Sequence, residues 1–222
     1  MIQAAIFDMD GLLVDSEPHW RTVEIGIFER VGVSLTEDEC KLTTGLPTDA
    51  VVDYWFARRP WDETILTRAD IAQAIIEGAH REIGLHAEAM PGAIETLHFF
   101  RERHLPMGIA SASPMHLIEV VIDRLGIRDF FTIWHSATLE ARNKPAPDVY
   151  LGAARKLGAE PGRCIAFEDS GNGLLSAHAA GMPTVAVPAD YEFDDPKFDI
   201  ATVKIPALTA FGDAVFQEIN RT

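Results

Sequence analysis

The chain has 222 residues, long enough for one domain that carries an insertion, and 47% of them are hydrophobic. Its 34 acidic and 19 basic residues give a formal net charge of −15 at pH 7. This balance disfavours nucleic-acid and anionic-membrane partners, both of which require a basic surface. No apolar run approaches the length of a membrane span either. We therefore expect neither nucleic acid nor membrane as a partner.

The two cysteines, Cys40 and Cys164, lie far apart and outside any CxxC spacing. A disulfide framework is therefore not expected, which is typical of a protein in the reducing cytoplasm. The first residues lack the basic region of a signal peptide, and we expect a cytoplasmic monomer.

Short apolar runs alternate with amphipathic stretches along most of the chain. Their nearly continuous hydrophobicity is typical of parallel strands that are covered on both faces. Strands are predicted at 3–7, 107–110, 131–134, 164–167 and 184–188. Apolar residues repeat at helical spacing in 117–125 and 149–157, and glycines follow where these helices should end. The alternation predicts an α/β fold with a Rossmann-like, doubly wound parallel sheet.

The segment between the first and second predicted strands breaks this alternation. It has helical spacing and no strand pattern, and a capping box is predicted from Thr36 to Glu39. We interpret residues 15–88 as an inserted α-helical domain. Residues 1–14 and 89–222 then form the core domain.

Polar residues stand at the ends of several predicted strands. Asp8 and Asp10 follow the first strand, Ser111 the second, and Glu168 and Asp169 the fourth. Lys144 follows the third strand and directly precedes a predicted helix. Ligands of open parallel sheets bind beyond the carboxyl ends of the strands, so these side chains should converge on one site.

This cluster of carboxylates, together with a hydroxyl and an ammonium, suits the transfer of a phosphoryl group. Clustered carboxylates favour Mg²⁺, which binds one or two carboxylates together with waters and a substrate phosphate. When Asp8 attacks a phosphomonoester dianion, about three negative charges come together, and Mg²⁺ with Lys144 would balance them. Asp8 is then a covalent nucleophile, and Asp10 can protonate the leaving alcohol and later deprotonate water.

Four motifs in order resemble those of the haloacid dehalogenase-like hydrolase superfamily: DMDG at 8–11, GIASAS at 108–113, KPAPDVYL at 144–151 and FEDSGNGLLSAHAAGM at 167–182. The resemblance implies that Asp8 is the nucleophile and Asp10 the general acid and base. It implies that Ser111 and Ala112 bind the phosphoryl group and that Lys144 clamps its charge.

The same resemblance implies a magnesium site and a substrate cover. Asp8, Asp169 and the Asp10 backbone carbonyl would be the Mg²⁺ ligands, and Glu168 would contribute through the metal shell. The helical insertion resembles the superfamily's helical cap domain, which closes over the substrate and excludes water.

Further stretches are similar to the sugar-phosphatase branch of the superfamily, which includes bacterial 2-deoxyglucose-6-phosphate and hexitol phosphatases. They are DSEPHW at 15–20, TGLPTDAVVDYWFARRPW at 44–61 and ASASPMHLIEVV at 110–121. The expected activity is Mg²⁺-dependent hydrolysis of small sugar or polyol phosphate monoesters through a phosphoaspartate. Glu17 and His19, just after the hinge to the insertion, are candidate substrate contacts.

Two other functions remain open. A β-phosphoglucomutase shares the core and the cap, but this chain has Pro47, Thr48 and Asp49 where a mutase places an Arg for the second phosphate. The cap histidine of a mutase falls opposite Trp20, one position after His19. A catalytically silent binding protein on this fold is less favoured because every chemical position is filled.

Overall fold

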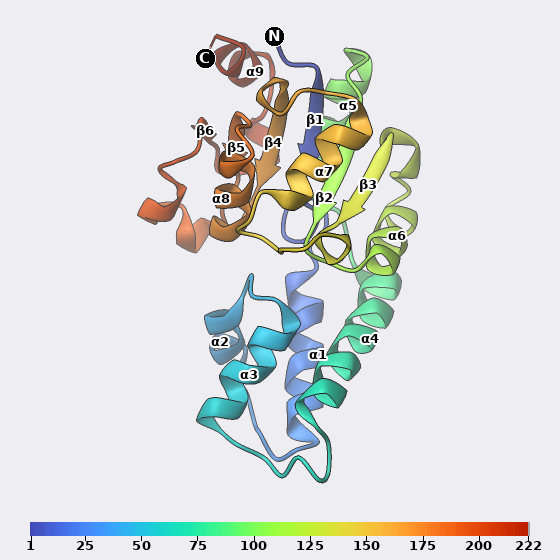
Figure 1. Ribbon diagram of the computed structural model, residues 1–222, viewed down its shortest axis with the longest axis vertical. Helices are drawn as coiled ribbons and strands as arrows, with labels where there is room; N and C mark the ends of the chain where they lie inside the picture. The colour runs from blue at the N-terminus through green and yellow to red at the C-terminus, as the bar shows by residue number, and fades with distance from the viewer. Residues whose placement is uncertain (222) are drawn as a thin grey trace. The chain divides into compact units, whose positions relative to one another are not determined.

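The computed structural model describes residues 1–221, which divide into two compact units. The larger unit joins Met1–Asp15 to the chain from Glu88 onward, and the smaller unit is Ser16–Ala87. All six strands of the described chain belong to the larger unit (Figure 1). The smaller unit, every residue of which is described, consists of helices and their connections and has no strand.

The strands of the larger unit form one parallel sheet in the order β3-β2-β1-β4-β5-β6. From β1 the chain builds outward to β3, then returns to β4 on the other side of β1, so the strand order reverses between β1 and β4. The strands are β1 (Ala4–Phe7), β2 (Met107–Ser111), β3 (Ile133–Ser136), β4 (Cys164–Glu168), β5 (Thr184–Ala186) and β6 (Val203–Lys204). The carboxyl ends at such a reversal form the ligand-binding crevice of doubly wound sheets.

Helices cover both faces of this sheet. Ala4 and Ile6 of β1 belong to a hydrophobic cluster with residues of α7 and α8, and Figure 1 shows α7 in front of the sheet. On the other face the ring of Phe100 in α5 packs against Phe7 and Phe167, with centroids 5.8 and 5.7 Å apart. The helices of this unit are α5 (Ala93–Glu102), α6 (Met115–Arg124), α7 (Asp148–Leu157), α8 (Gly171–Ala179) and α9 (Asp213–Ile219).

This architecture confirms the predicted α/β fold class and corrects details of its strands. β3 begins two residues after the start of the apolar run at 131–134, because Phe131 ends the 3₁₀ turn Arg128–Phe130 and is not yet in the ladder. The fifth strand ends at Ala186 instead of residue 188. β6 was not predicted, since two residues are too few to show a periodic pattern.

The smaller unit has its own hydrophobic core. Val23 and Phe28 of one helix pack with Trp55 and Ile75 of two others. The capping box predicted at Thr36 forms with Glu39, and a second one forms between Thr67 and Asp70. The helices are α1 (Glu17–Glu29), α2 (Glu37–Cys40), α3 (Thr48–Arg58) and α4 (Arg68–His86).

Within residues 1–221, none of the helices combines the length and the apolar character that crossing a bilayer demands.

Candidate active site

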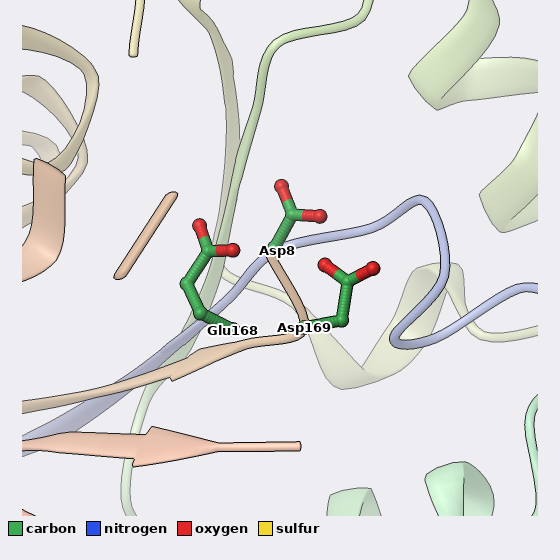
Figure 2. Close-up of side chains that lie close together, drawn as sticks. All are labelled: Asp8, Glu168 and Asp169. Atoms are coloured by element: carbon green, nitrogen blue, oxygen red, sulfur yellow. The ribbon is translucent and has the colours of Figure 1, made fainter. Parts of the chain in front are cut away.

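Three carboxylates meet at the carboxyl ends of β1 and β4. Asp8 directly follows β1, Glu168 is the last residue of β4, and Asp169 comes next. The pairing of Phe7 with Phe167 and the hydrogen bond from Asp8 N to Phe167 O, 3.0 Å, hold these ends together. Each of the three residues has a carboxylate oxygen within 4.8 Å of the others. Figure 2 shows the three side chains extending to the same side of the strand ends.

Lys144 places its ammonium group between two of these carboxylates. Its Nζ lies 2.5 Å from Asp8 Oδ1 and 2.7 Å from Glu168 Oε1, and its side chain is only 7% exposed. Burial alone would lower the pKa of Lys144, but the charges of Asp8 and Glu168 outweigh it and raise this pKa above its ordinary value. Lys144 therefore stays charged and clamps both strand ends.

One ammonium does not balance the negative charge gathered here. Burial raises the pKa of Asp8 to about 8; Lys144 opposes this rise, while Glu168 and Asp10 add to it. With a pKa near 8 the Asp8 carboxyl holds its proton at neutral pH, so its ionisation for nucleophilic attack calls for a further positive charge beside it. The donor set of Asp8, Glu168 and Asp169 consists of hard oxygens, which fits a divalent cation such as Mg²⁺.

Glu168 is fully buried and is held by two further side chains. The Tyr150 hydroxyl donates a hydrogen bond to Oε1 at 2.5 Å, and the Ser170 hydroxyl donates to Oε2 at 3.3 Å. A Cβ at Gly173 would lie 2.0 Å from Oε2, so only glycine at this place in α8 leaves room for the carboxylate. Sequence reasoning missed Tyr150, whose only signal is a hydroxyl on an otherwise apolar helix face.

Gly11 makes room for Asp169 in the same way. Its φ of +76° is a conformation that glycine adopts without strain, and a Cβ there would lie 2.2 Å from Asp169 Oδ2. The glycine of the DMDG motif thus provides both the turn after Asp10 and the space for the third carboxylate.

Asp10 lies beside the end of β2, where it is half-buried. Ser113 Oγ donates a hydrogen bond to Asp10 Oδ2 at 2.7 Å, and Ser113 N donates to Ser111 Oγ at 3.0 Å. Ser111 is buried as the last residue of β2, and Ala112 follows it in an exposed position. The structure thus brings the predicted core residues to the neighbouring ends of β1, β2 and β4, and it adds Ser113, which sequence reasoning missed.

Glu17 and His19 belong to the helical unit. Glu17 lies 3.3 Å from the Arg21 guanidinium and accepts from the Thr44 hydroxyl at 3.5 Å. The ring of His19 stacks on that of His86, with the centroids 6.4 Å apart. These contacts lie within the unit Ser16–Ala87, and a role for either residue in substrate binding stays a prediction.

The arrangement as a whole suits nucleophilic attack by a carboxylate on an electron-poor centre of an anionic substrate. Asp8 is the carboxylate at the point where the strand order reverses, and Lys144 supplies a fixed positive charge beside it. Asp10 accepts a hydrogen bond from the Ser113 hydroxyl.

Comparison with known proteins shows the family of the chain. The family model described as haloacid dehalogenase-like hydrolase matches residues 2–181. Hexitol phosphatase B of Escherichia coli is 41% identical over 94% of this chain and 93% of that protein. Fructose-1-phosphate phosphatase YqaB of Escherichia coli is 29% identical over 82% of this chain and 94% of that protein.

A solved structure shares the fold over almost its whole length. CbbY from Rhodobacter sphaeroides, crystallised in complex with phosphate, has a TM-score of 0.85 and 25% sequence identity, covering 96% of this chain and 97% of that one. Since both the family model and a relative at 41% identity cover most of the chain, the protein belongs to the haloacid dehalogenase-like hydrolase family.

Proposed function

We propose that the protein is a Mg²⁺-dependent phosphatase that hydrolyses small sugar or polyol phosphate monoesters through a phosphoaspartate intermediate. The observation that carries the proposal is the Lys144 ammonium, buried between Asp8 and Glu168 at the switch point of the sheet. The names of the hexitol and fructose-1-phosphate phosphatases among its relatives support the phosphatase activity and the substrate class.

In this proposal, Asp8 is the nucleophile. One of its carboxylate oxygens bonds to phosphorus while the ester P–O bond breaks, and the departing alkoxide takes a proton from Asp10. Water then attacks the phosphorus of the phosphoaspartate and gives a proton to Asp10. This step breaks the bond between Asp8 and phosphorus, releases inorganic phosphate, and restores the Asp8 carboxylate and the protonated Asp10. Ser111 and Ala112 bind the phosphoryl oxygens, and Lys144 neutralises charge beside Asp8.

The metal site is also part of the proposal. Asp8, Asp169 and the backbone carbonyl of Asp10 would hold Mg²⁺, with Glu168 acting through the metal shell. When bound, the cation supplies positive charge that stabilises the phosphoryl group during transfer. Gly11 and Gly173 support this assignment, because both leave space for the carboxylates of the donor set.

We propose the helical unit, predicted at residues 15–88, as the cap that selects the substrate, with Glu17 and His19 as substrate contacts. The family resemblance supports these assignments, and the unit is compact and has its own hydrophobic core. Action as a monomer in the cytoplasm is likewise our expectation.

The test is the Asp8→Asn variant, with Asp190→Asn as a matched control on an exposed carboxyl of the same unit. Wild type and control should release phosphate from a hexitol phosphate and from p-nitrophenyl phosphate. Folded Asp8→Asn should release none, because an amide is a poor nucleophile. Wild-type rates in Asp8→Asn would contradict the covalent mechanism, and primed isomerisation of β-glucose 1-phosphate with little phosphate release would identify a mutase instead.

A further inference from the structure

Ser113 is the last residue of the GIASAS motif, in which only Ser111 and Ala112 have an expected role, and it contacts the proposed acid and base of the reaction. Its hydroxyl donates to Asp10 Oδ2 at 2.7 Å. Asp10 is half-buried and directly precedes the turn that begins at Gly11, outside any helix or named strand. A carboxyl group that donates its proton to one particular substrate oxygen must be held in one orientation. A hydrogen bond to one carboxyl oxygen fixes the direction of the other.

Ser113 is itself held by the ends of two strands. Its backbone N–H donates to Ser111 Oγ at 3.0 Å, at the end of β2. Its carbonyl accepts from Ser136 Oγ at 2.7 Å, at the end of β3. Ser136 is fully buried, and its Oγ lies 2.8 Å from Thr138 Oγ1. The backbone of Ser113 is therefore anchored on both sides, which restricts where its hydroxyl can lie.

We infer that Ser113 is a positioning residue that orients Asp10 for proton transfer to the leaving alcohol, with Ser136 anchoring Ser113 from β3. The inference rests on the proposed phosphatase function and adds to it a residue that acts through Asp10. Ser113 needs no contact with the phosphoryl group for this role, which separates it from Ser111 and Ala112.

This role predicts that the rate lost on removing the Ser113 hydroxyl depends on the leaving group of the substrate. Removing the Ser113 hydroxyl should slow loss of an alcohol that needs a proton and spare loss of p-nitrophenolate, which leaves without one. General acid catalysis is worth about 10²–10⁴-fold, and misplacing a catalytic group by about 1 Å costs up to about 10²-fold. We therefore expect Ser113→Ala to slow release of a hexitol from its phosphate about 10–100-fold in a single turnover. Release of p-nitrophenolate should change less than about threefold.

Two variants and one control complete the design. Ser113→Thr keeps the hydroxyl and should restore alcohol release to within about threefold of wild type. Ser113→Cys keeps the size with a weak donor and carries the test if Ser113→Ala fails to fold; it should show the same preference for the nitrophenyl ester. Thr96→Val removes a buried hydroxyl that donates to Gly92 O at 2.8 Å in α5, and it should leave both rates unchanged.

The decisive measurement is made in the Asp10→Asn background. There Ser113→Ala should slow alcohol release no further, because both changes remove the same oriented proton donor. Equal slowing of both esters by Ser113→Ala, or a full additional loss in the Asp10→Asn background, would overturn the inference while leaving the phosphatase standing. Failure of the wild type to release phosphate from any monoester would instead overturn the proposed function, and this inference with it.

Discussion

Glu24 carries a buried carboxyl in the helical unit, and its replacement by Gln should stabilise that unit in a pH-dependent way. Glu24 is 9% exposed in α1. Burial raises the pKa of Glu24 from its ordinary 4.5 to about 7, Glu17 adds to the rise, and Cys40 and Arg21 oppose it. The folded unit therefore prefers the protonated acid, whereas the unfolded chain ionises near pH 4.5.

The size of the effect follows from the difference between these two pKa values. A difference from 4.5 to about 7, at about 1.36 kcal/mol for each unit, corresponds to roughly 3 kcal/mol. Below pH 4.5 both states are protonated and Glu24 carries no penalty; the penalty grows as the pH rises towards 7 and is complete above about pH 8. Glu24→Gln keeps the size but also buries an amide that needs partners. We therefore expect a gain of about 1–3 kcal/mol in the free energy of unfolding at pH 8.5 and about 0 at pH 4.5.

Urea unfolding followed by tryptophan fluorescence can report on the helical unit alone. Trp20, Trp55 and Trp61 lie in that unit and Trp134 lies in β3, so a Trp134→Phe background leaves only helical-unit signal. The free energy of unfolding of Trp134→Phe would be compared with that of Trp134→Phe/Glu24→Gln at several pH values from 4.5 to 8.5. Titrations of other groups then cancel in the difference. Glu29→Gln, on an exposed carboxyl of the same helix, is the control and should show no such trend. A Glu24→Gln difference that is flat with pH, or that shrinks as the pH rises, would refute the reasoning.

Two further results are expected. Gly152→Ala in α7 should destabilise the protein by about 1–3 kcal/mol, because a Cβ would lie 2.4 Å from His135 Nε2 and 2.5 Å from Glu140 Oε1. Gly26→Ala in α1 should stabilise the protein by about 0.5–1 kcal/mol, because a Cβ there would have no atom within 4 Å. Thermal unfolding of both variants checks these two expectations, and a loss of stability in both variants would contradict them. Excess EDTA should abolish phosphate release, Mg²⁺ should restore it, and Ca²⁺ should fail because its coordination shell is larger and looser. Full activity in excess EDTA would refute the metal assignment.

The fold and part of the site were predictable because they depend on local sequence. Asp8, Ser111 and Glu168 each end an apolar run, and parallel strands bring such endings to one edge of a sheet whatever the distance along the chain. Lys144 was predictable because it stands before a helix start in the same alternating pattern. For these residues, the position in an element determines the position in space.

The supporting residues were not predictable, because their role depends on which elements become neighbours. Tyr150 sits on the apolar face of α7, and only the packing of that helix on the sheet brings its hydroxyl to Glu168. Gly173 matters because a carboxylate from β4 fills the space where its Cβ would be. Glu24 lies beside apolar Val23 and Ile27 in α1, and the sequence does not distinguish a buried carboxyl there from an exposed one.

The burial of the site carboxylates matches the different tasks proposed for them. Glu168 is fully buried, and Lys144, Tyr150 and Ser170 all donate to it, so it is suited to hold charge in a fixed place. Asp10 is half-buried beside a turn and so keeps part of its surface open to solvent, as a residue that exchanges protons with substrate and water requires. Access and orientation make opposing demands on such a residue, since exposure frees the rotamers that catalysis must restrict. A hydroxyl anchored on the ends of two strands resolves this conflict, because it orients Asp10 without burying it.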